Sequence, residues 1–206
     1  TSFEVSDSEK VLSNEKRFVM DNAYWGPDYS DEQIEEVLNE ERVKFSKIDN
    51  IEEATAKLIS EGKIIGWFQN KMEWGPRALG NRSLLADPRD AKIKEVLNMR
   101  IKKRESFRPF APSVLEEDVN DWFELPKNCK SISTEFMEFT FPVKESKKNL
   151  IPAVTHIDGT SRIQVATKKS NLKYHKLISE FKKITGVPMV LNTSFNENEP
   201  IVCSPT

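Results

Sequence analysis

The sequence predicts a mixed α/β (α+β) fold, in which a twisted sheet of mixed strand direction packs against flanking helices. Short runs rich in β-branched and aromatic residues, such as 63–68 (KIIGWF) and 187–196 (VPMVLNTSFN), are typical of strands. Longer segments with apolar residues at helical spacing, such as 171–186, are typical of helices. Because strands and helices are interspersed without strict alternation, the pattern favours a mixed sheet over a doubly wound parallel one.

The ends of the expected helices carry recognisable signals. Ser30 with Gln33, and Asn50 with Glu53, have the spacing of a capping box. Glycines then follow two of the helical patterns, where they are favoured as terminating residues. The helices are expected over 30–41, 50–62, 87–103, 117–125 and 171–186, and the strands over 63–68, 107–115, 134–143, 161–167 and 187–196.

Composition limits the classes of function that the chain can perform. The 206 residues hold 31 Lys and Arg against 33 Asp and Glu, for a formal net charge of -2. No broad basic surface is therefore expected, and a nucleic-acid partner is disfavoured. The two cysteines, Cys129 and Cys203, lie far apart and form no metal-binding motif. The sequence has no apolar run long enough to span a bilayer, so we expect a cytoplasmic protein without a membrane segment.

Four loop segments nevertheless gather Arg, Lys, Ser and Asn at the ends of apolar elements. They are 75–83 (GPRALGNRS), 101–110 (IKKRESFRPF), 154–164 (VTHIDGTSRIQ) and 191–196 (LNTSFN). Ligands of open α/β sheets tend to lie at strand ends, where such loops meet. Guanidinium groups suit phosphate or carboxylate oxygens, and glycine lets the backbone approach a ligand. Together the four segments predict a local anion site.

Each segment also has an ordinary structural explanation. Arg77 and Arg82 could be solvated surface charges. Glu73 and Asp87 would then be their partners, in the weak ion pairs that are common at surfaces. The basic run 101–105 could be the exposed last turn of a helix, where the helix dipole favours cations.

Ordinary structural explanations also exist for Arg108 and for the two histidines, His156 and His175. Arg108 lies between aromatic and proline residues, so it either extends along apolar surface or points at a specific partner. His156 could be a turn residue bonded to Asp158, while His175, on a helix among lysines, is expected to be solvated. No metal-ligand cluster is predicted from these residues.

The long motifs of the chain resemble a known family. Segments 61–90, 97–114, 151–164 and 185–205 are similar to the C-terminal half of the O-carbamoyltransferases, which include nodulation and antibiotic-tailoring enzymes. The resemblance implies a YrdC-like domain over 30–206, which forms carbamoyl-adenylate from carbamoyl phosphate and ATP and releases pyrophosphate and phosphate. Mg²⁺ would accompany the triphosphate.

The same resemblance implies a missing partner domain. In the family, a Kae1-like N-terminal domain holds iron or another metal and transfers the carbamoyl group to an acceptor hydroxyl. We therefore expect residues 1–29 to be an irregular linker from that domain. We also expect the YrdC-like domain to be truncated at its C-terminus, before a closing helix and strand.

The resemblance also implies site residues. Residues 102–104 (KKR) and 194–196 (SFN) match a Lys-x-Arg and Ser-x-Asn signature, although the following NENEP lacks an expected glycine. Phosphates would be held by Lys102, Arg104 and Arg108, the implied catalytic residues, together with Arg77. Arg162 would bind carbamoyl phosphate or the adenylate. The implied substrate- and nucleotide-binding residues are Arg77, Arg82, His156, Arg162, Asn192, Ser194 and Asn196.

Clustered cations without a catalytic nucleophile agree with adenylate formation, which depends on positioning and charge stabilisation. Two alternatives stay open. One is a non-catalytic nucleotide- or RNA-binding YrdC-like module. The other is a threonylcarbamoyl-adenylate synthase, which fits the fold but fits segments 75–83 and 107–113 poorly.

Overall fold

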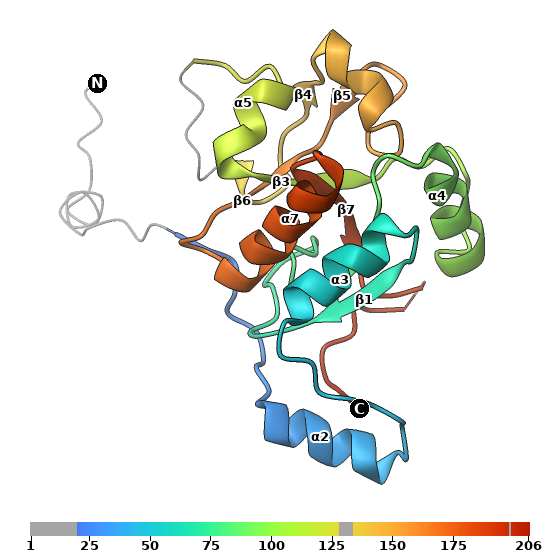
Figure 1. Cartoon of the computed structure of the whole chain (residues 1–206), viewed down its shortest axis with the longest axis vertical. Coiled ribbons are helices and arrows are strands. Elements are labelled where there is room, and N and C mark those ends of the chain that lie inside the picture. The colour runs from blue at the N-terminus through green and yellow to red at the C-terminus, as the bar shows by residue number, and fades with distance from the viewer. Residues whose placement is uncertain (1–19, 128–133, 198) are drawn as a thin grey trace, which may run out of the picture.

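One mixed sheet organises the computed structural model, which describes residues 20–127, 134–197 and 199–206 (Figure 1). Its five strands are β1 (Ile65–Phe68), β2 (Arg82–Ala86), β3 (Ala111–Leu115), β6 (Gln164–Ala166) and β7 (Met189–Ser194). They lie in the order β1-β2-β7-β3-β6. β3 pairs with β6 in parallel, and the other neighbouring pairs are antiparallel. The predicted α+β class with a mixed sheet is confirmed.

The central strand β7 places the polar motifs next to one another. Asn192 is paired with Leu85 of β2 on one side and with Ala111 of β3 on the other, and Ser194 is paired with Ser83. Since both neighbours are antiparallel to β7, its C-terminal end lies beside the first residues of β2 and β3. The loops that precede those two strands therefore meet at this end of β7.

Two helices cover the sheet as the sequence predicts. Helix α3 (Ile51–Ser60) packs along α7 (Leu172–Thr185), and α7 also contacts β3 and β7 (Figure 1). Leu177, Ile178 and Phe181 of α7 are fully buried, whereas Ile184, expected to face inward, is half exposed because the last turn reaches solvent. None of the described helices has the length and apolar character needed to cross a membrane.

The helix ends confirm one of the two predicted capping boxes. Ser30 and Gln33 form both reciprocal hydrogen bonds at the start of α2 (Asp31–Glu40), a helix that projects away from the rest of the chain (Figure 1). Asn50 makes no side-chain cap hydrogen bond to α3 in the described structure, so that prediction was wrong. Gly186 ends α7 in the left-handed conformation, with φ 75°.

Several boundaries differ from the sequence prediction. The helix expected over 87–103 begins later, as α4 (Ala91–Val96), and continues as the π-helical turn η1 (Leu97–Ile101). The strand expected over 161–167 is divided between β6 and β5 (Thr160–Ser161). The expected short helix is present as η2 (Glu116–Asp118) and α5 (Val119–Trp122), and η3 (Glu145–Leu150) was not predicted.

Two further predictions were wrong for a physical reason. The alternating segment 134–143 forms a strand only at β4 (Phe141–Pro142), because Met137 adopts a positive φ of 56° that interrupts an extended chain. His175 is buried rather than solvated, and its Nε2 lies 3.0 Å from Oε2 of Glu117. Residues 1–19 of the expected linker, and Cys129, lie outside the described residues.

Candidate anion-binding site

The loop between β1 and β2 is held from inside by a buried carboxylate. Oε1 of Glu73 accepts hydrogen bonds from the backbone N–H groups of Leu79 and Asn81, both at 2.7 Å, and of Arg82 at 3.2 Å. Glu73 is therefore committed to the backbone and is not a surface partner of arginine. Gly80 has a positive φ of 103° and lies against the ring of Tyr174, where a side chain would clash.

Arg82 closes the base of the same loop. It is fully buried, and its Nη1 donates to the carbonyl oxygens of Gln69 at 2.7 Å and Asn70 at 3.0 Å. Its guanidinium also lies 3.6 Å from the centre of the Phe68 ring, and Nη2 donates to Pro27 O at 3.3 Å. These contacts make Arg82 a support of the loop, and it does not line the cavity described next.

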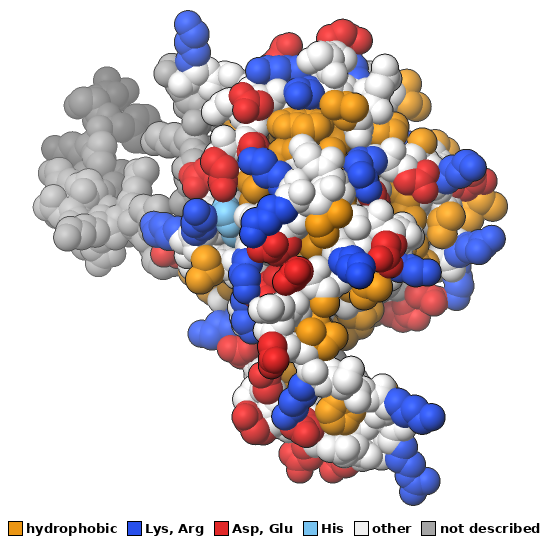
Figure 2. Space-filling view, in the orientation of Figure 1, with side chains coloured by type: hydrophobic (Ala, Val, Ile, Leu, Met, Phe, Trp, Pro, Cys, Tyr) orange, Lys and Arg blue, Asp and Glu red, His pale blue; other side chains and the backbone are white. Residues whose placement is uncertain are grey.

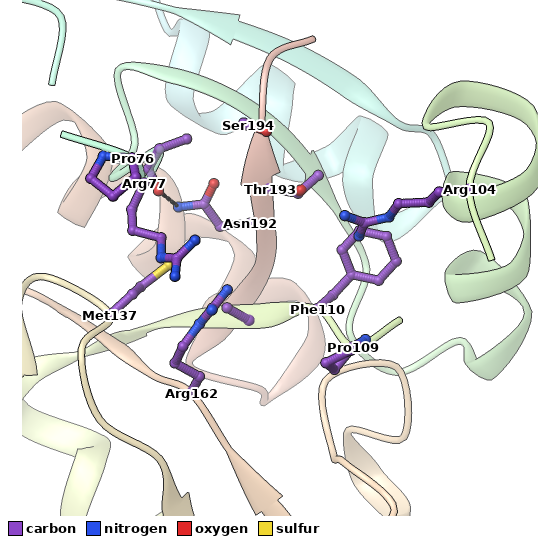
Figure 3. A pocket seen from close by; sticks show the side chains of 12 residues that line it. Pro76, Arg77, Arg104, Pro109, Phe110, Met137, Arg162, Asn192, Thr193 and Ser194 are labelled. Carbon is purple, nitrogen blue, oxygen red and sulfur yellow. Dashed lines mark hydrogen bonds between the residues drawn. The ribbon is translucent and has the colours of Figure 1, made fainter. Parts of the chain in front are cut away.

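A small cavity opens at the C-terminal end of β7, with a volume of about 110 Å³. Arg77, Arg104 and Arg162 reach it from three separate segments, and their guanidinium groups point toward its centre (Figure 3). Among the described residues that line the cavity, none is acidic. The lining consists of Pro76, Arg77, Ala78, Arg104, Pro109, Phe110, Ala111, Met137, Arg162, Asn192, Thr193 and Ser194.

The pKa of Arg162 responds to the other two arginines of the cavity. Burial, followed by the charge of Arg77 and, more weakly, that of Arg104, lowers the pKa of Arg162, while Glu138 opposes the shift. Burial also lowers the pKa of Arg104. Nε of Arg162 is buried and has no hydrogen-bond partner among the described residues. Clustered like charges with an unused donor favour the binding of an anion.

Arg104 is the arginine whose direction is best fixed. Its Nε donates to Oδ1 of Asn98 at 2.7 Å, and its guanidinium lies 5.0 Å from the centre of the Phe110 ring. Asn98 is fully buried, and its amide also donates to the carbonyl oxygens of Ser106 and Arg108. The π-helical turn that carries Asn98 therefore sets the position of the Arg104 side chain.

The two signature segments meet at Lys102. Its Nζ donates to the carbonyl oxygens of Ser194 and Asn196, and to Oδ1 of Asn196 at 2.8 Å. Burial, with the charge of Arg104 nearby, lowers the pKa of Lys102 to about 8. Lys102 is 2% exposed and does not line the cavity, so in this structure it positions Ser194, which does.

The remaining predicted site residues lie apart from the cavity lining. Arg108 is exposed and pairs with Glu105, with Nε 2.9 Å from Oε2. His156 occupies a turn in which its backbone N–H donates to Thr160 O, and burial lowers its pKa. Asp158, considered as the partner of His156, accepts hydrogen bonds from Thr160 instead.

The face shown in Figure 2 carries charges of both signs rather than a broad basic surface. On the face shown in Figure 2, Lys and Arg side chains are interspersed with Asp and Glu over most of the surface. Asp87, the other proposed surface partner of Arg77 and Arg82, pairs with Arg89, with Nη2 2.6 Å from Oδ2. Among the described residues, no ion pair is formed by Arg77, and no cluster of three or more His, Cys, Asp or Glu is placed to hold a metal.

Sequence reasoning predicted the uncharged lining residues Asn192 and Ser194 but missed several other residues that support or complete the site. Glu73 organises the loop, and Thr193 and Met137 contribute to the cavity lining. The Lys-x-Arg signature was a sufficient signal for Arg104 but gave none for Asn98. A buried asparagine in a helical segment is a weak signal by itself, although it indicates a required hydrogen-bond partner.

The fold and cavity define a mixed α/β domain with an arginine-lined cavity at one end of the central strand. The chain belongs to the carbamoyltransferase family, because residues 56–206 match the family described as Carbamoyltransferase C-terminus. The resemblance inferred from the motifs is thereby confirmed.

Relatives with assigned names agree with this family. Nodulation protein NolNO of Sinorhizobium fredii is 50% identical over 203 residues, which cover 94% of this chain and 30% of that protein. Nodulation protein NolO of Bradyrhizobium diazoefficiens is 49% identical over 187 residues, covering 89% and 34%. The 3'-hydroxymethylcephem-O-carbamoyltransferase of Amycolatopsis lactamdurans is 39% identical over 140 residues, covering 68% and 25%. The chain thus spans about a third or less of the length of these relatives.

Arg77 and Arg82 should respond differently to the same substitution. Arg82→Met should lower the free energy of unfolding by about 3 kcal/mol, since it leaves buried carbonyl groups without a donor. Arg77→Met should change it by less than about 0.5 kcal/mol and weaken sulfate binding. Urea denaturation and sulfate titration measure the two effects. Equal destabilisation by the two variants would contradict the separate roles.

The charge of Lys102 should make anion binding depend on pH. Because its pKa is lowered to about 8, Lys102 is protonated below pH 8 and loses its charge as the pH rises through 8. The affinity for sulfate, whose own charge is constant in this range, should fall by about fivefold between pH 7 and 9. In Lys102→Met the affinity for sulfate should be nearly independent of pH between about 7 and 9. If the affinity of that variant still falls over this range, the pH dependence belongs to another group.

Proposed function

We propose that this chain binds carbamoyl phosphate and ATP and forms carbamoyl-adenylate. The observation that carries the proposal is the convergence of Arg77, Arg104 and Arg162 on one cavity whose described lining has no acidic residue. Two polyanionic substrates repel each other in water. Fixed guanidinium groups offset that repulsion and hold phosphate oxygens in defined directions.

The proposed reaction requires the protein to position the substrates and does not require a protein nucleophile. For both pyrophosphate and phosphate to be released, carbamoyl phosphate must lose its phosphate to water. A carbamate oxygen then attacks the α-phosphorus of ATP, and pyrophosphate leaves. In this proposal Arg77, Arg104 and Arg162 stabilise the phosphate charge, while Lys102 keeps Ser194 at the edge of the cavity. Mg²⁺ would accompany the triphosphate.

The size of the cavity favours the smaller substrate at its centre. Pockets that enclose a drug-sized ligand usually measure about 300–1,000 Å³. The volume here is about 110 Å³, so the cavity accommodates a phosphate with a small acyl group more readily than a whole nucleotide. We therefore place carbamoyl phosphate, or the carbamoyl and phosphate part of the adenylate, among the three arginines.

The complete transfer reaction would need a further domain. The named relatives are about three times as long as their matched part. We propose that a Kae1-like N-terminal domain, with its own metal ion, receives the carbamoyl group and passes it to an acceptor hydroxyl. Residues 30–206 would then form the adenylate-forming domain of a cytoplasmic enzyme.

Pyrophosphate release tests the proposed reaction. Release should require carbamoyl phosphate, ATP and Mg²⁺ together. Arg77→Ala should lower its kcat/KM by about 100-fold or more, because it removes charge stabilisation at the reacting phosphates. Arg100→Ala, which removes an exposed arginine on η1 outside the cavity lining, is the matched control and should retain wild-type activity.

Other outcomes would identify the alternatives. Pyrophosphate release with ATP, threonine and bicarbonate would indicate a threonylcarbamoyl-adenylate synthase. ATP or RNA binding that never leads to release, even with all substrates present, would indicate a non-catalytic module. Unchanged kcat/KM in Arg77→Ala would contradict the assignment of the cavity to this reaction.

A further inference from the structure

Asn192, which lines the cavity, carries a hydrogen-bond acceptor that the described residues do not use. Oδ1 of Asn192 is buried and has no hydrogen-bond partner among the described residues, although Asn192 lines the cavity. The residue is 2% exposed, which distinguishes this oxygen from the solvated polar atoms of a surface loop. A buried acceptor left without a donor destabilises the unliganded chain, so a ligand that supplies the donor binds more tightly.

The orientation of the Asn192 amide is fixed by its neighbours. Its Nδ2 donates to the carbonyl oxygen of Ala78 at 3.0 Å, a bond drawn in Figure 3, and to Oε1 of Gln164 at 3.1 Å. Gln164 is itself oriented, because its Nε2 donates to Leu79 O at 2.8 Å and its Oε1 accepts from Ser113. Rotating the Asn192 amide would place Oδ1 against two acceptors. Oδ1 is therefore the atom left without a partner.

Two residues of the cavity lining thus carry unused groups of opposite character. Nε of Arg162 is a buried donor, and Oδ1 of Asn192 is a buried acceptor. A bare phosphate supplies acceptor oxygens for the arginines but, when fully ionised, no donor for Asn192. A carbamoyl group supplies an NH₂ donor beside the phosphate. An acetyl group of nearly the same shape presents a methyl group at that position.

We propose that Oδ1 of Asn192 accepts a hydrogen bond from the NH₂ of the substrate's carbamoyl group. It thereby selects carbamoyl phosphate over acyl phosphates of the same size that carry no N–H donor. This inference rests on the proposed function, since it assumes that an acyl phosphate occupies the three-arginine cavity. A site built to bond a substrate N–H discriminates strongly against an analogue without it, because its buried polar group is then left unpaired.

Calorimetric titration with three probes tests the inference: carbamoyl phosphate, acetyl phosphate and inorganic phosphate. The wild-type chain should bind carbamoyl phosphate at least about fivefold more tightly than acetyl phosphate. In Asn192→Ala this ratio should fall to about one. The affinity for inorganic phosphate should change little, because the arginines remain.

Ser113→Ala provides the matched control. Oγ of Ser113 lies 3.0 Å from Nδ2 of Asn192, so the variant disturbs the same network but leaves Oδ1 in place. It should retain the preference for carbamoyl phosphate. If Asn192 had only a structural role, both variants would bind all three probes more weakly. The ratio of the affinities for carbamoyl phosphate and acetyl phosphate would then stay unchanged.

Three outcomes would overturn the inference, and they distinguish its failure from that of the proposed function. Equal wild-type affinity for carbamoyl and acetyl phosphate, or an unchanged ratio in Asn192→Ala, would refute the role of Asn192 while leaving the anion cavity and the proposed function intact. Failure of the wild-type chain to bind carbamoyl phosphate at all would refute both the role of Asn192 and the proposed function. The wild-type comparison alone decides the matter if Asn192→Ala does not fold.

Discussion

Repulsion among three guanidinium groups is the constraint that shapes the site. Arg77, Arg104 and Arg162 converge on one small cavity, and burial, followed by the charges of the other two arginines, lowers the pKa of Arg162. Such a cluster costs free energy in the unliganded chain, and interactions elsewhere in the fold must offset that cost. The fold therefore has to supply rigid supports for these side chains, and an anion in the cavity would relieve the strain of their proximity.

Those supports are buried polar groups that bind backbone rather than ligand. Glu73 and Arg82 fix the two ends of the loop that carries Arg77, through hydrogen bonds to backbone groups. Asn98 fixes Arg104 from the π-helical turn. Lys102 joins that turn to the end of β7 through its bonds to Ser194 and Asn196. Arg77, Arg104 and Arg162 thus face the cavity, whereas Glu73, Arg82 and Lys102 hold the surrounding backbone in place.

The sequence predicted the class of fold and the meeting of the four polar segments, because strand patterns and motifs are local signals. It could not separate Arg77 from Arg82, since both lie in one glycine-containing loop. Their difference depends on Pro27 and Phe68, which are distant in sequence from the second arginine. Strand β2 was missed because it follows directly on that loop. The free Oδ1 of Asn192 follows from tertiary hydrogen bonds that no local pattern encodes.

A crystal structure of the chain with carbamoyl phosphate tests the central claim most directly. The phosphate group should lie in the cavity at the end of β7, with its oxygens within hydrogen-bond distance of the guanidinium groups of Arg77, Arg104 and Arg162. An empty cavity at saturating ligand, or a phosphate bound elsewhere on the chain, would contradict it.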